Sequence, residues 1–597
     1  MSNMSKFDIL FKEAQIYDGT GAPPFKGSVG VKGERINMIS EPTQGSQDDA
    51  RTVIEARGLA LVPGFIDVHN HADLSILYYP KAESFARQGI TSFVGGHCGD
   101  SPGPYGDYIG EPWFYREIYE DARPRMDRQD WLIPREMLNA KHREVFGWEI
   151  DWKTMGEFLK KVGQQGLSLN YVPLVGHGTI RSYVMETDFK RYATKKEIKE
   201  MRELTEQAML EGCRGLSVGR TYEPGSWASF DEVLACAKVA AKYGGIYNSH
   251  CLRSAPRGDK KPGELPPNPL HGVEEVISIA KKAEISVQIS HLGNSFVVQP
   301  PDNDIMTEAA VRATLHIVDN AVNDGLNVNF DVIPHHQTGG IFTTPYLIGV
   351  LSQWLRIAGT PGQMAKALLM EDLRDEIKAR IDSGKIMNLN PMQTPDWAQT
   401  RIIRECKDTR FLNRSIAKIA EELKLDPLDT LFKIIMADPW TRTETTRTKD
   451  DRAKLEYFRH PRMMIGVDTF AVDDKNESRH PPWLLPNENA FGGMARYLRR
   501  AARETKILTL QEAIRKITSL PATKFRMSNR GILKVGAYAD IVVMNPETIS
   551  DQGSQIEPRI YAKGIEYVTV NGSLVVRKGE HTGALPGKVL YREVEQE

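Results

Sequence analysis

The middle of the chain alternates between short apolar runs and longer amphipathic stretches. The apolar runs have the length of strands and end in polar residues, whereas stretches such as 195–210 and 273–283 repeat their apolar positions at helical spacing. Eight such β-then-α units predict an α/β fold with a closed parallel (β/α)8 TIM barrel rather than an open sheet. The predicted strands are 64–71, 89–98, 169–177, 214–219, 245–250, 285–291, 326–334 and 463–468.

The two ends of the chain carry a different pattern, made of short β-type segments. These segments lie within residues 7–39 and 539–577. A hairpin is expected around Asn571-Gly572, because both residues of that pair tolerate positive φ. We expect both ends to meet in one small β-domain, with two unrelated β caps as the alternative.

Two long segments interrupt the barrel pattern. Residues 100–153 are rich in Pro, Trp, Tyr and charge, and a loop of this length after a barrel strand is typical of a lid or a pocket wall. Residues 340–457 are largely helical. The predicted domains are a β-domain of residues 1–62 and 526–597, a barrel of residues 63–345 and 458–525, and an inserted helical subdomain of residues 346–457.

Composition narrows the class of protein and its partners. Of 597 residues, 41% are hydrophobic and 26% are charged, which is ordinary for a globular protein. A net charge of −1 argues against nucleic acid or an anionic membrane as the main partner. The five scattered cysteines do not resemble a disulfide framework, and no signal peptide or membrane-spanning apolar run is evident. We expect a cytoplasmic protein that acts on a small molecule, and a homo-oligomer is compatible with its size.

Polar side chains gather at the carboxyl ends of the predicted strands, which form one rim in a parallel barrel. An isolated His-x-His pair is more often a surface feature. His69 and His71 nevertheless follow a buried-looking strand and face the same side, because they lie two residues apart. Chance does not readily place so many functional groups at strand ends. The full set is His69, His71, Cys98, His177, His250, His291 and Asp468.

Three of these residues offer the ligands of a catalytic zinc ion. Cys98 gives a thiolate and His250 and His291 give imidazoles, which leaves the fourth position of the ion open. His69 and His71 offer a second, weaker position nearby. The sequence therefore predicts one or two divalent ions, with Zn2+ favoured over manganese or iron by the thiolate and the imidazoles. A lone cysteine more often packs in a core, so this prediction depends on the whole set.

Asp468 ends the eighth predicted strand. A carboxylate beside a metal-activated water can take its proton during attack and return it to the leaving nitrogen, which predicts a general acid/base role. The alternatives for Asp468 are a structural salt bridge or an additional metal ligand. Asp67, two residues before His69, is expected to orient a ligand histidine. Cys251 follows His250 directly and points to the opposite side of the strand, so it is left out of the site.

These residues carry a resemblance to a known family that extends over nearly the whole chain. Residues 63–71, Pro-Gly-Phe-Ile-Asp-Val-His-Asn-His, are similar to the first-strand signature of the amidohydrolase superfamily. The resemblance implies a (β/α)8 barrel, a β-sandwich domain built from both termini, zinc shared by Cys98 between two positions, and Asp468 as the acid/base. The motifs that resemble its D-aminoacylase (N-acyl-D-amino-acid deacylase) branch are Cys98 before Gly99, Tyr247-Asn-Ser-His250, Gln288-Ile-Ser-His291 and the Asp468 strand.

The sequence departs from this family where the substrate carboxylate is bound. A lysine of the family is replaced by Gly293, and its His-Pro-Arg segment reads His480-Pro-Pro482. Its tyrosine-containing segment after strand seven has His335 and His336 instead. Loss of a charged anchor from a partly desolvated pocket weakens binding. By position, the resemblance implies substrate contacts from Tyr222, Arg253, His335 and His480.

The sequence thus predicts a metal-dependent amidohydrolase that cleaves a C–N amide bond and is D-aminoacylase-like without the usual carboxylate-binding residues. We expect a neutral or cyclic amide as the substrate rather than an ordinary N-acyl-D-amino acid. The alternative enzyme is a cyclic-amide (lactam- or hydantoin-type) or lactone hydrolase. A non-catalytic scaffold is disfavoured, because such a scaffold is expected to lose metal ligands or the strand-eight aspartate.

Overall fold

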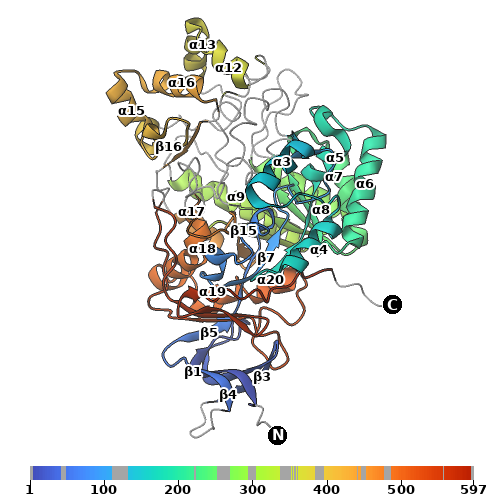
Figure 1. Ribbon diagram of the computed structural model, residues 1–597, viewed down its shortest axis with the longest axis vertical. Coiled ribbons are helices and arrows are strands. Elements are labelled where there is room, and N and C mark those ends of the chain that lie inside the picture. The colour runs from blue at the N-terminus through green and yellow to red at the C-terminus, as the bar shows by residue number, and fades with distance from the viewer. Residues whose placement is uncertain are drawn as a thin grey trace.

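A computed structural model gives the fold of the chain. A β-sheet, a central α/β part and a group of helices follow one another along the longest axis of the molecule (Figure 1). The structure describes residues 5–41, 49–110, 132–220, 224–251, 269–292, 304–335, 351, 354, 358, 361–382, 396–439, 441–445, 452–475, 486–554 and 557–592.

A nine-stranded sheet joins the two ends of the chain. Its central strand, β5 (Ala60–Pro63), pairs in parallel with β1 (Phe7–Ile16) and antiparallel with β19 (Ile541–Met544). The predicted hairpin is present, and its turn residues Asn571 and Gly572 both have positive φ, of 46° and 76°. The remaining strands of the sheet are β2 (Phe25–Lys32), β3 (Arg35–Ser40), β4 (Ala50–Glu55), β20 (Ile565–Val570), β21 (Ser573–Arg577) and β22 (Glu580–His581).

Each of the predicted apolar runs of the middle contains a strand, and all of these strands pair in parallel. They form one sheet in the order β10-β7-β6 and another in the order β11-β12-β13-β14-β15-β18. Backbone hydrogen bonds link the two sheets on both sides, from Arg214 N, directly before β12, to Pro173 O of β10 at 2.7 Å and from Val68 N to Ile465 O at 3.3 Å. The strands are β6 (Phe65–Asp67), β7 (Ile90–Gly95), β10 (Asn170–Pro173), β11 (Val175–Gly176), β12 (Gly215–Gly219), β13 (Ile246–His250), β14 (Ser286–Ile289), β15 (Val328–Val332) and β18 (Met463–Ile465).

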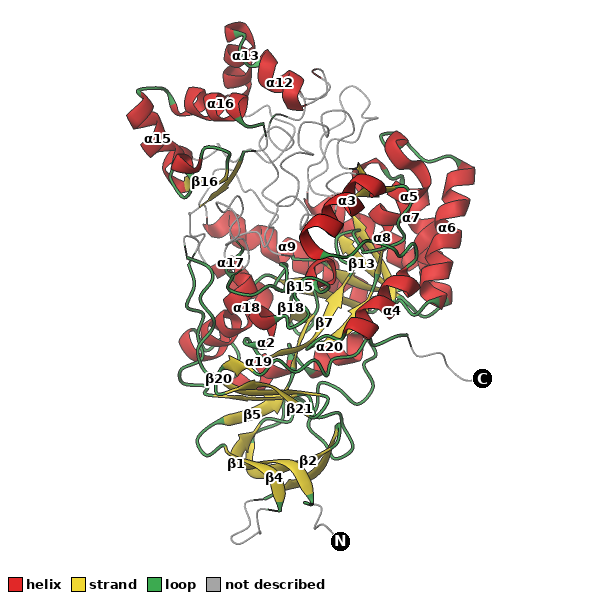
Figure 2. Ribbon diagram, in the orientation of Figure 1, coloured by secondary structure: helices red, strands yellow, loops and turns green. Residues whose placement is uncertain are grey.

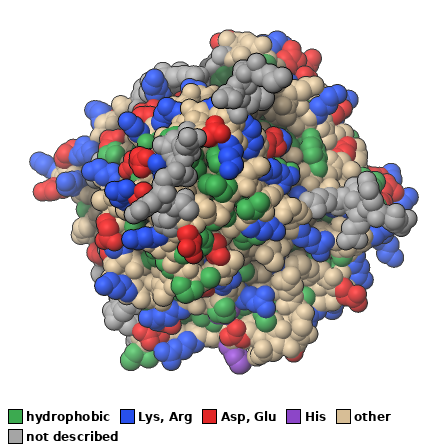
Figure 3. Space-filling model, turned by 90° about the horizontal axis from the view of Figure 1, so that it is seen from below, with side chains coloured by type: hydrophobic (Ala, Val, Ile, Leu, Met, Phe, Trp, Pro, Cys, Tyr) green, Lys and Arg blue, Asp and Glu red, His purple; other side chains and the backbone are tan. Residues whose placement is uncertain are grey.

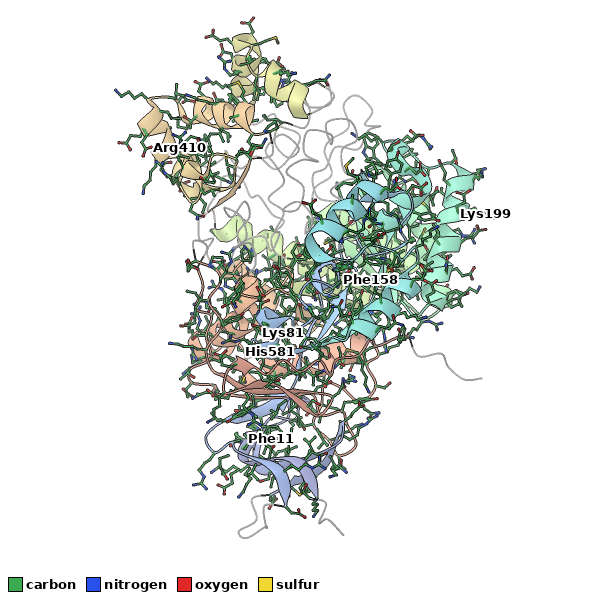
Figure 4. All side chains as sticks on the ribbon, viewed as in Figure 1. Phe11, Lys81, Phe158, Lys199, Arg410 and His581 are labelled. Atoms are coloured by element: carbon green, nitrogen blue, oxygen red, sulfur yellow. The ribbon has the colours of Figure 1, made fainter. Side chains whose placement is uncertain are left out.

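Amphipathic helices cover the parallel strands (Figure 2). Capping boxes begin two of them, with Thr154 and Thr194 each accepting from the backbone N–H three residues later. Apolar faces of these helices pack on the strands in one large core that includes Phe158, whereas Phe11 belongs to a separate core of the nine-stranded sheet (Figure 4). The helices are α4 (Met155–Gln165), α5 (His177–Met185), α6 (Lys195–Leu210), α7 (Phe230–Lys242), α8 (Pro269–Ala283), α9 (Asp304–Asn323), α17 (Arg452–Arg459), α18 (Asn489–Leu498) and α19 (Leu510–Arg515).

The segment between β15 and β18 is mainly helical where the structure describes it, with one antiparallel pair of strands, and it packs a hydrophobic core of its own between residues 351 and 435. Its helices from α12 to α16 stand at the top of Figure 1, and Arg410 marks this part in Figure 4. The exact domain bounds stay a prediction. The elements are α12 (Pro361–Ala367), α13 (Glu371–Asp382), α14 (Trp397–Thr400), β16 (Arg401–Glu405), α15 (Ile416–Leu423), α16 (Pro427–Ala437) and β17 (Arg442–Thr445).

The excursion after β7 is described only in part. It contains the short antiparallel pair β8 (Tyr108–Gly110) and β9 (Leu132–Pro134) and the helix α3 (Arg135–Phe146). Residues 111–131 lie outside the described part, so a role as a lid or a pocket wall stays a prediction.

Three buried cations occupy the amino ends of the parallel strands. Arg214, directly before β12, donates four hydrogen bonds to backbone carbonyl oxygens of the C-terminal part of the chain. Lys524 Nζ donates to Val287 O at 2.8 Å and to Asn327 O at 2.9 Å, at the starts of β14 and β15. Lys516 Nζ donates to a carbonyl oxygen just before β18. At this end of the strands, the buried basic side chains are therefore stabilised by the dipoles of backbone carbonyl groups.

Charges of both signs alternate over the face of the molecule that Figure 3 shows. That distribution agrees with the net charge of −1 and offers no basic patch on this face for a polyanion. Among the described residues, no helix combines the length and the apolar composition that a membrane crossing requires.

Candidate metal centre

The structure brings the predicted metal ligands and Asp468 together. Two groups of donor atoms form, and within each group all of the atoms lie within 4.8 Å of one another. Cys98 belongs to both groups. One group consists of His69, His71, Cys98 and Asp468, and the other consists of Cys98, His250 and His291.

The spacing of the donor atoms fits a tetrahedral zinc ion. Cys98 Sγ lies 3.4 Å from His69 Nε2, 3.6 Å from His250 Nδ1 and 3.7 Å from His291 Nε2. Asp468 Oδ1 lies 3.4 Å from Nε2 of both His69 and His71. With zinc bonds of about 2.3 Å to sulfur and about 2.05 Å to nitrogen or oxygen, tetrahedral angles separate sulfur from nitrogen by about 3.6 Å and nitrogen from oxygen by about 3.3 Å. The residues present therefore fit the ion that the sequence predicted.

Each donor stands at or just beyond the carboxyl end of a parallel strand. His69 and His71 follow β6, Cys98 follows β7, and His250 is the last residue of β13. Backbone hydrogen bonds hold the segments after β6 and β18 side by side, from Asp468 N to His69 O at 2.8 Å and from His71 N to Thr469 O at 2.9 Å. Residues almost 400 positions apart in the chain thus present their side chains to one point.

The backbone of the site is left-handed at three donors. Cys98, His291 and Asp468 have φ angles of 59°, 37° and 48°, a region that residues with a Cβ atom enter rarely. Gly99, which follows Cys98, has a φ of 84°, and a Cβ atom there would lie 2.7 Å from Gly219 N. Such conformations persist only where the surrounding structure enforces them, and they turn these side chains inward at the strand ends.

Neighbouring groups of opposite charge stabilise the ionised forms of the side chains in the site. Burial opposes ionisation of the Cys98 thiol, but the imidazoles of His69, His291 and His71 outweigh it and hold the pKa of Cys98 well below its ordinary value. Burial also opposes ionisation of Asp468, and His69 and His71 hold the pKa of that carboxyl well below its ordinary value. Burial lowers the pKa of His71, yet Asp468 and Cys98 together raise it to about 10. The anionic donors thus stabilise positive charge at this point, as a bound divalent cation requires.

The residues behind the donors differ from the sequence-based expectation in one respect. Asp67 does not orient a histidine ring: its Oδ1 accepts from the backbone N–H groups of His69 and Val467, at 3.2 and 3.1 Å. The carboxylate beside the His69 ring belongs to Asp331, whose Oδ1 lies 3.4 Å from His69 Nδ1. No local sequence pattern signals this contact, because Asp331 lies on β15 and is remote from His69 along the chain.

Two histidines outside the donor groups are also buried near strand ends. His97 stacks on His69, with ring centroids 4.3 Å apart, and its Nδ1 lies 3.1 Å from Asn248 Oδ1. His97 is not among the candidates predicted from the sequence. His177 was predicted to lie on the rim; its Nε2 lies 3.1 Å from Glu232 Oε1, and it is not a member of either donor group.

Three of the four predicted substrate contacts, Tyr222, Arg253 and His480, lie outside the described residues, as do Gly293 and Pro482. The fourth, His335, is buried. Its backbone N–H and its ring both contact Asn489 Oδ1, and its Nε2 lies 3.5 Å from Asp551 Oδ2. Burial lowers the pKa of His335 to about 4. Its role in substrate binding stays a prediction.

The chain is similar to known proteins over almost its whole length. Residues 52–147 and 413–576 match the model of the Amidohydrolase family. Over 588 residues the chain is 26% identical to an N-acyl-D-glutamate deacylase of Alcaligenes xylosoxydans xylosoxydans, and the match covers 98% of this chain and 97% of the relative.

Two solved structures share the fold along almost the whole chain. A crystal structure of D-aminoacylase superposes with a TM-score of 0.71 at 23% identity and covers 98% of this chain and 100% of its own. The N-acyl-D-glutamate deacylase of Bordetella bronchiseptica, solved with zinc and a phosphonate inhibitor, superposes with a TM-score of 0.70 at 24% identity over the same shares. The family match and the deacylase relative confirm the resemblance seen in the sequence: the chain is D-aminoacylase-like and is similar to proteins of the amidohydrolase superfamily.

Proposed function

We propose that this protein hydrolyses the C–N bond of a small amide in a metal-dependent site. Cys98, His250 and His291 would hold one divalent ion, and His69 and His71 would complete a second position that shares Cys98. The observation that supports this proposal best is the convergence of these donors at one point. Cys98 Sγ lies at the distances from the imidazole nitrogens that a tetrahedral zinc ion between them would require. A non-catalytic scaffold would have no need to keep the whole set, together with Asp468, at one point.

The arrangement of the strands supports a closed (β/α)8 barrel as the scaffold of this site. Their order is that of a barrel, and hydrogen bonds join the two parallel sheets on both sides. In such barrels the active site lies at the carboxyl ends of the strands, which is where the donors stand. The nine-stranded sheet would form the predicted β-domain, on the side of the barrel away from the carboxyl ends of its strands.

A divalent ion held by these donors would supply Lewis acidity, which lowers the pKa of water to about 7 and polarises a carbonyl group. The chain itself supplies the proton acceptor. Asp468 is ionised, because its pKa lies well below its ordinary value, and its Oδ1 faces the same point as the imidazoles of His69 and His71. Asp468 takes the proton of the attacking water on a carboxylate oxygen and returns it to the leaving nitrogen.

The substrate we propose is a neutral or cyclic amide. Glycine at position 293 and proline at position 482 remove the cations that bind a substrate carboxylate in the resembled family. A site built around a carboxylate loses binding energy when its cationic partner is absent. A lactam- or hydantoin-type ring, or a lactone, is the alternative substrate that the same site would accept.

Steady-state assays test this proposal directly. The zinc-loaded enzyme is offered N-acetyl-D-amino acids, neutral N-acyl amides, and hydantoins or lactams, and Cys98→Ala serves as the metal-deficient control. We expect turnover of a neutral or cyclic amide and, in the variant, loss of both zinc and activity. Efficient hydrolysis of N-acetyl-D-amino acids would refute the substrate proposal, and a Cys98→Ala variant with unchanged zinc content would refute the ligand assignment.

A further inference from the structure

One buried carboxylate contacts both groups of donors. Asp331 lies on β15 and is inaccessible to solvent. Its Oδ1 lies 3.4 Å from Nδ1 of His69, in one donor group, and accepts a hydrogen bond of 2.8 Å from the backbone N–H of His291, in the other. Asp331 is not itself a member of either donor group.

The contact with His69 falls on the side of the ring that faces away from the other donors. His69 Nε2 is directed at Cys98 Sγ and Asp468 Oδ1, both 3.4 Å away. A metal ion bound to Nε2 would leave the proton of the neutral imidazole on Nδ1. That proton faces Asp331 Oδ1 at ion-pair distance, although His69 Nδ1 makes no hydrogen bond of standard geometry with the described residues. Carboxylates in this position hold the tautomer and the orientation of a ligand histidine.

The contact with His291 acts on the backbone instead. His291 has the left-handed φ of 37°, which a residue with a Cβ atom adopts only when its surroundings enforce it. Asp331 holds this residue and the next one, because its side chain accepts from His291 N at 2.8 Å and its carbonyl oxygen accepts from Leu292 N at 2.7 Å. Both bonds fix the direction in which the His291 ring leaves the chain.

The Asp331 carboxylate is itself held in place. Gln288 Nε2 donates to its Oδ2 at 2.9 Å. Gly466 makes room for it, since a Cβ atom at that position would lie 3.0 Å from Asp331 Oδ1 and 2.3 Å from His69 Cβ. The position of this carboxylate between the two histidines is therefore determined by packing as well as by hydrogen bonds.

We propose that Asp331 is a positioning residue that anchors a ligand of each metal position at once, His69 at one and His291 at the other. The inference rests on the proposed function, because it takes His69 and His291 as ligands. It predicts that substitution of Asp331, which binds no metal itself, lowers the zinc affinity of both positions. Loss of a ligand that belongs to one position should instead lower mainly the zinc affinity of that position.

The test compares Asp331→Asn with Asn329→Ala. The first keeps the size of the side chain and removes its charge. The second removes a buried polar side chain from the same face of β15, whose Nδ2 donates to Arg462 O rather than to a donor residue. Zinc affinity of each purified protein is measured by competition with a chelator, and cobalt substitution reports the thiolate–metal absorption of Cys98.

We expect both zinc-binding steps of Asp331→Asn to weaken by about 10–100-fold, with a shifted cobalt spectrum, while Asn329→Ala behaves as the parent protein. Unchanged affinity in Asp331→Asn, weakening of a single step, or an equal loss in both variants would overturn the inference. If the parent protein binds no zinc, the proposed function fails instead. If Asp331→Asn does not fold, Gln288→Ala is measured in its place. It should show a smaller weakening of both steps, and no weakening would overturn the inference.

Discussion

The two ends of the parallel strands are built on opposite electrostatic principles. At the carboxyl ends, the ionised Cys98 and Asp468 face histidine rings in a buried cluster. At the amino ends, Arg214, Lys516 and Lys524 are buried against backbone carbonyl oxygens. One end therefore presents two anionic donors that stabilise positive charge beside them, and the other holds basic side chains that donate to backbone carbonyl groups.

The ends differ also in how completely their polar groups are paired. Lys524 Nζ has acceptors at 2.7, 2.8 and 2.9 Å, which are as many as an ammonium group can use. At the carboxyl ends, buried atoms such as Asp67 Oδ2, His97 Nε2 and Asn248 Nδ2 have no hydrogen-bond partner among the described residues. Buried polar atoms without partners are uncommon in folded proteins. Their presence at one end indicates function there, and the full pairing of Lys524 at the other indicates stability.

Asp468→Asn should show most clearly that the carboxyl ends of the strands serve activity and the amino ends serve stability. The variant loses the proton acceptor, so we expect turnover to fall by about 10²–10⁴-fold while zinc content and thermal stability stay close to those of the parent protein. Steady-state kinetics together with metal analysis by mass spectrometry measure both. An active, zinc-loaded variant would refute the acid/base role, and loss of zinc would assign Asp468 as a ligand.

Lys516 makes the amino end sensitive to alkaline pH. Burial lowers the pKa of Lys516 to about 8 in the folded protein. Between that value and the ordinary pKa of about 10.4, the unfolded chain binds more protons than the folded one, so stability rises with pH in this window and is flat below it. Against Lys516→Met, the parent protein should gain up to about 3 kcal/mol as the pH rises from about 8 to about 10.4. The free energies of unfolding of both proteins are measured at several pH values. A difference between them that does not change with pH would contradict the prediction.

Lys524→Met should act on stability alone and by a smaller amount. The substitution removes the hydrogen bonds that Nζ donates to Ser286 Oγ and Val287 O, while Asn327 O loses one bond and keeps the one from Val287 N at 3.0 Å. We expect this loss to cost about 1–3 kcal/mol. We expect a lower midpoint of unfolding with unchanged zinc content and turnover per folded molecule. A loss of zinc in this variant would show that the two ends are not independent.

Local pattern was sufficient to predict the strands, the candidate donors and the hairpin of this protein. Apolar runs of strand length mark the buried strands, and parallel strands of one barrel place their carboxyl ends on one rim, so His69, His71, Cys98, His250, His291 and Asp468 could be grouped before any coordinates were known. Asn571-Gly572 predicted its turn for an equally local reason, since both residues adopt positive φ.

Only the tertiary structure decided what stands behind the donors. The sequence suggested Asp67 as the partner of a ligand ring, because it is close in the chain, but its carboxylate contacts backbone N–H groups and the ring of His69 faces Asp331. The left-handed φ angles of Cys98, His291 and Asp468 were equally hidden. Side-chain direction beyond a strand end depends on these angles and on packing against residues hundreds of positions away. Neither leaves a periodic trace in the sequence.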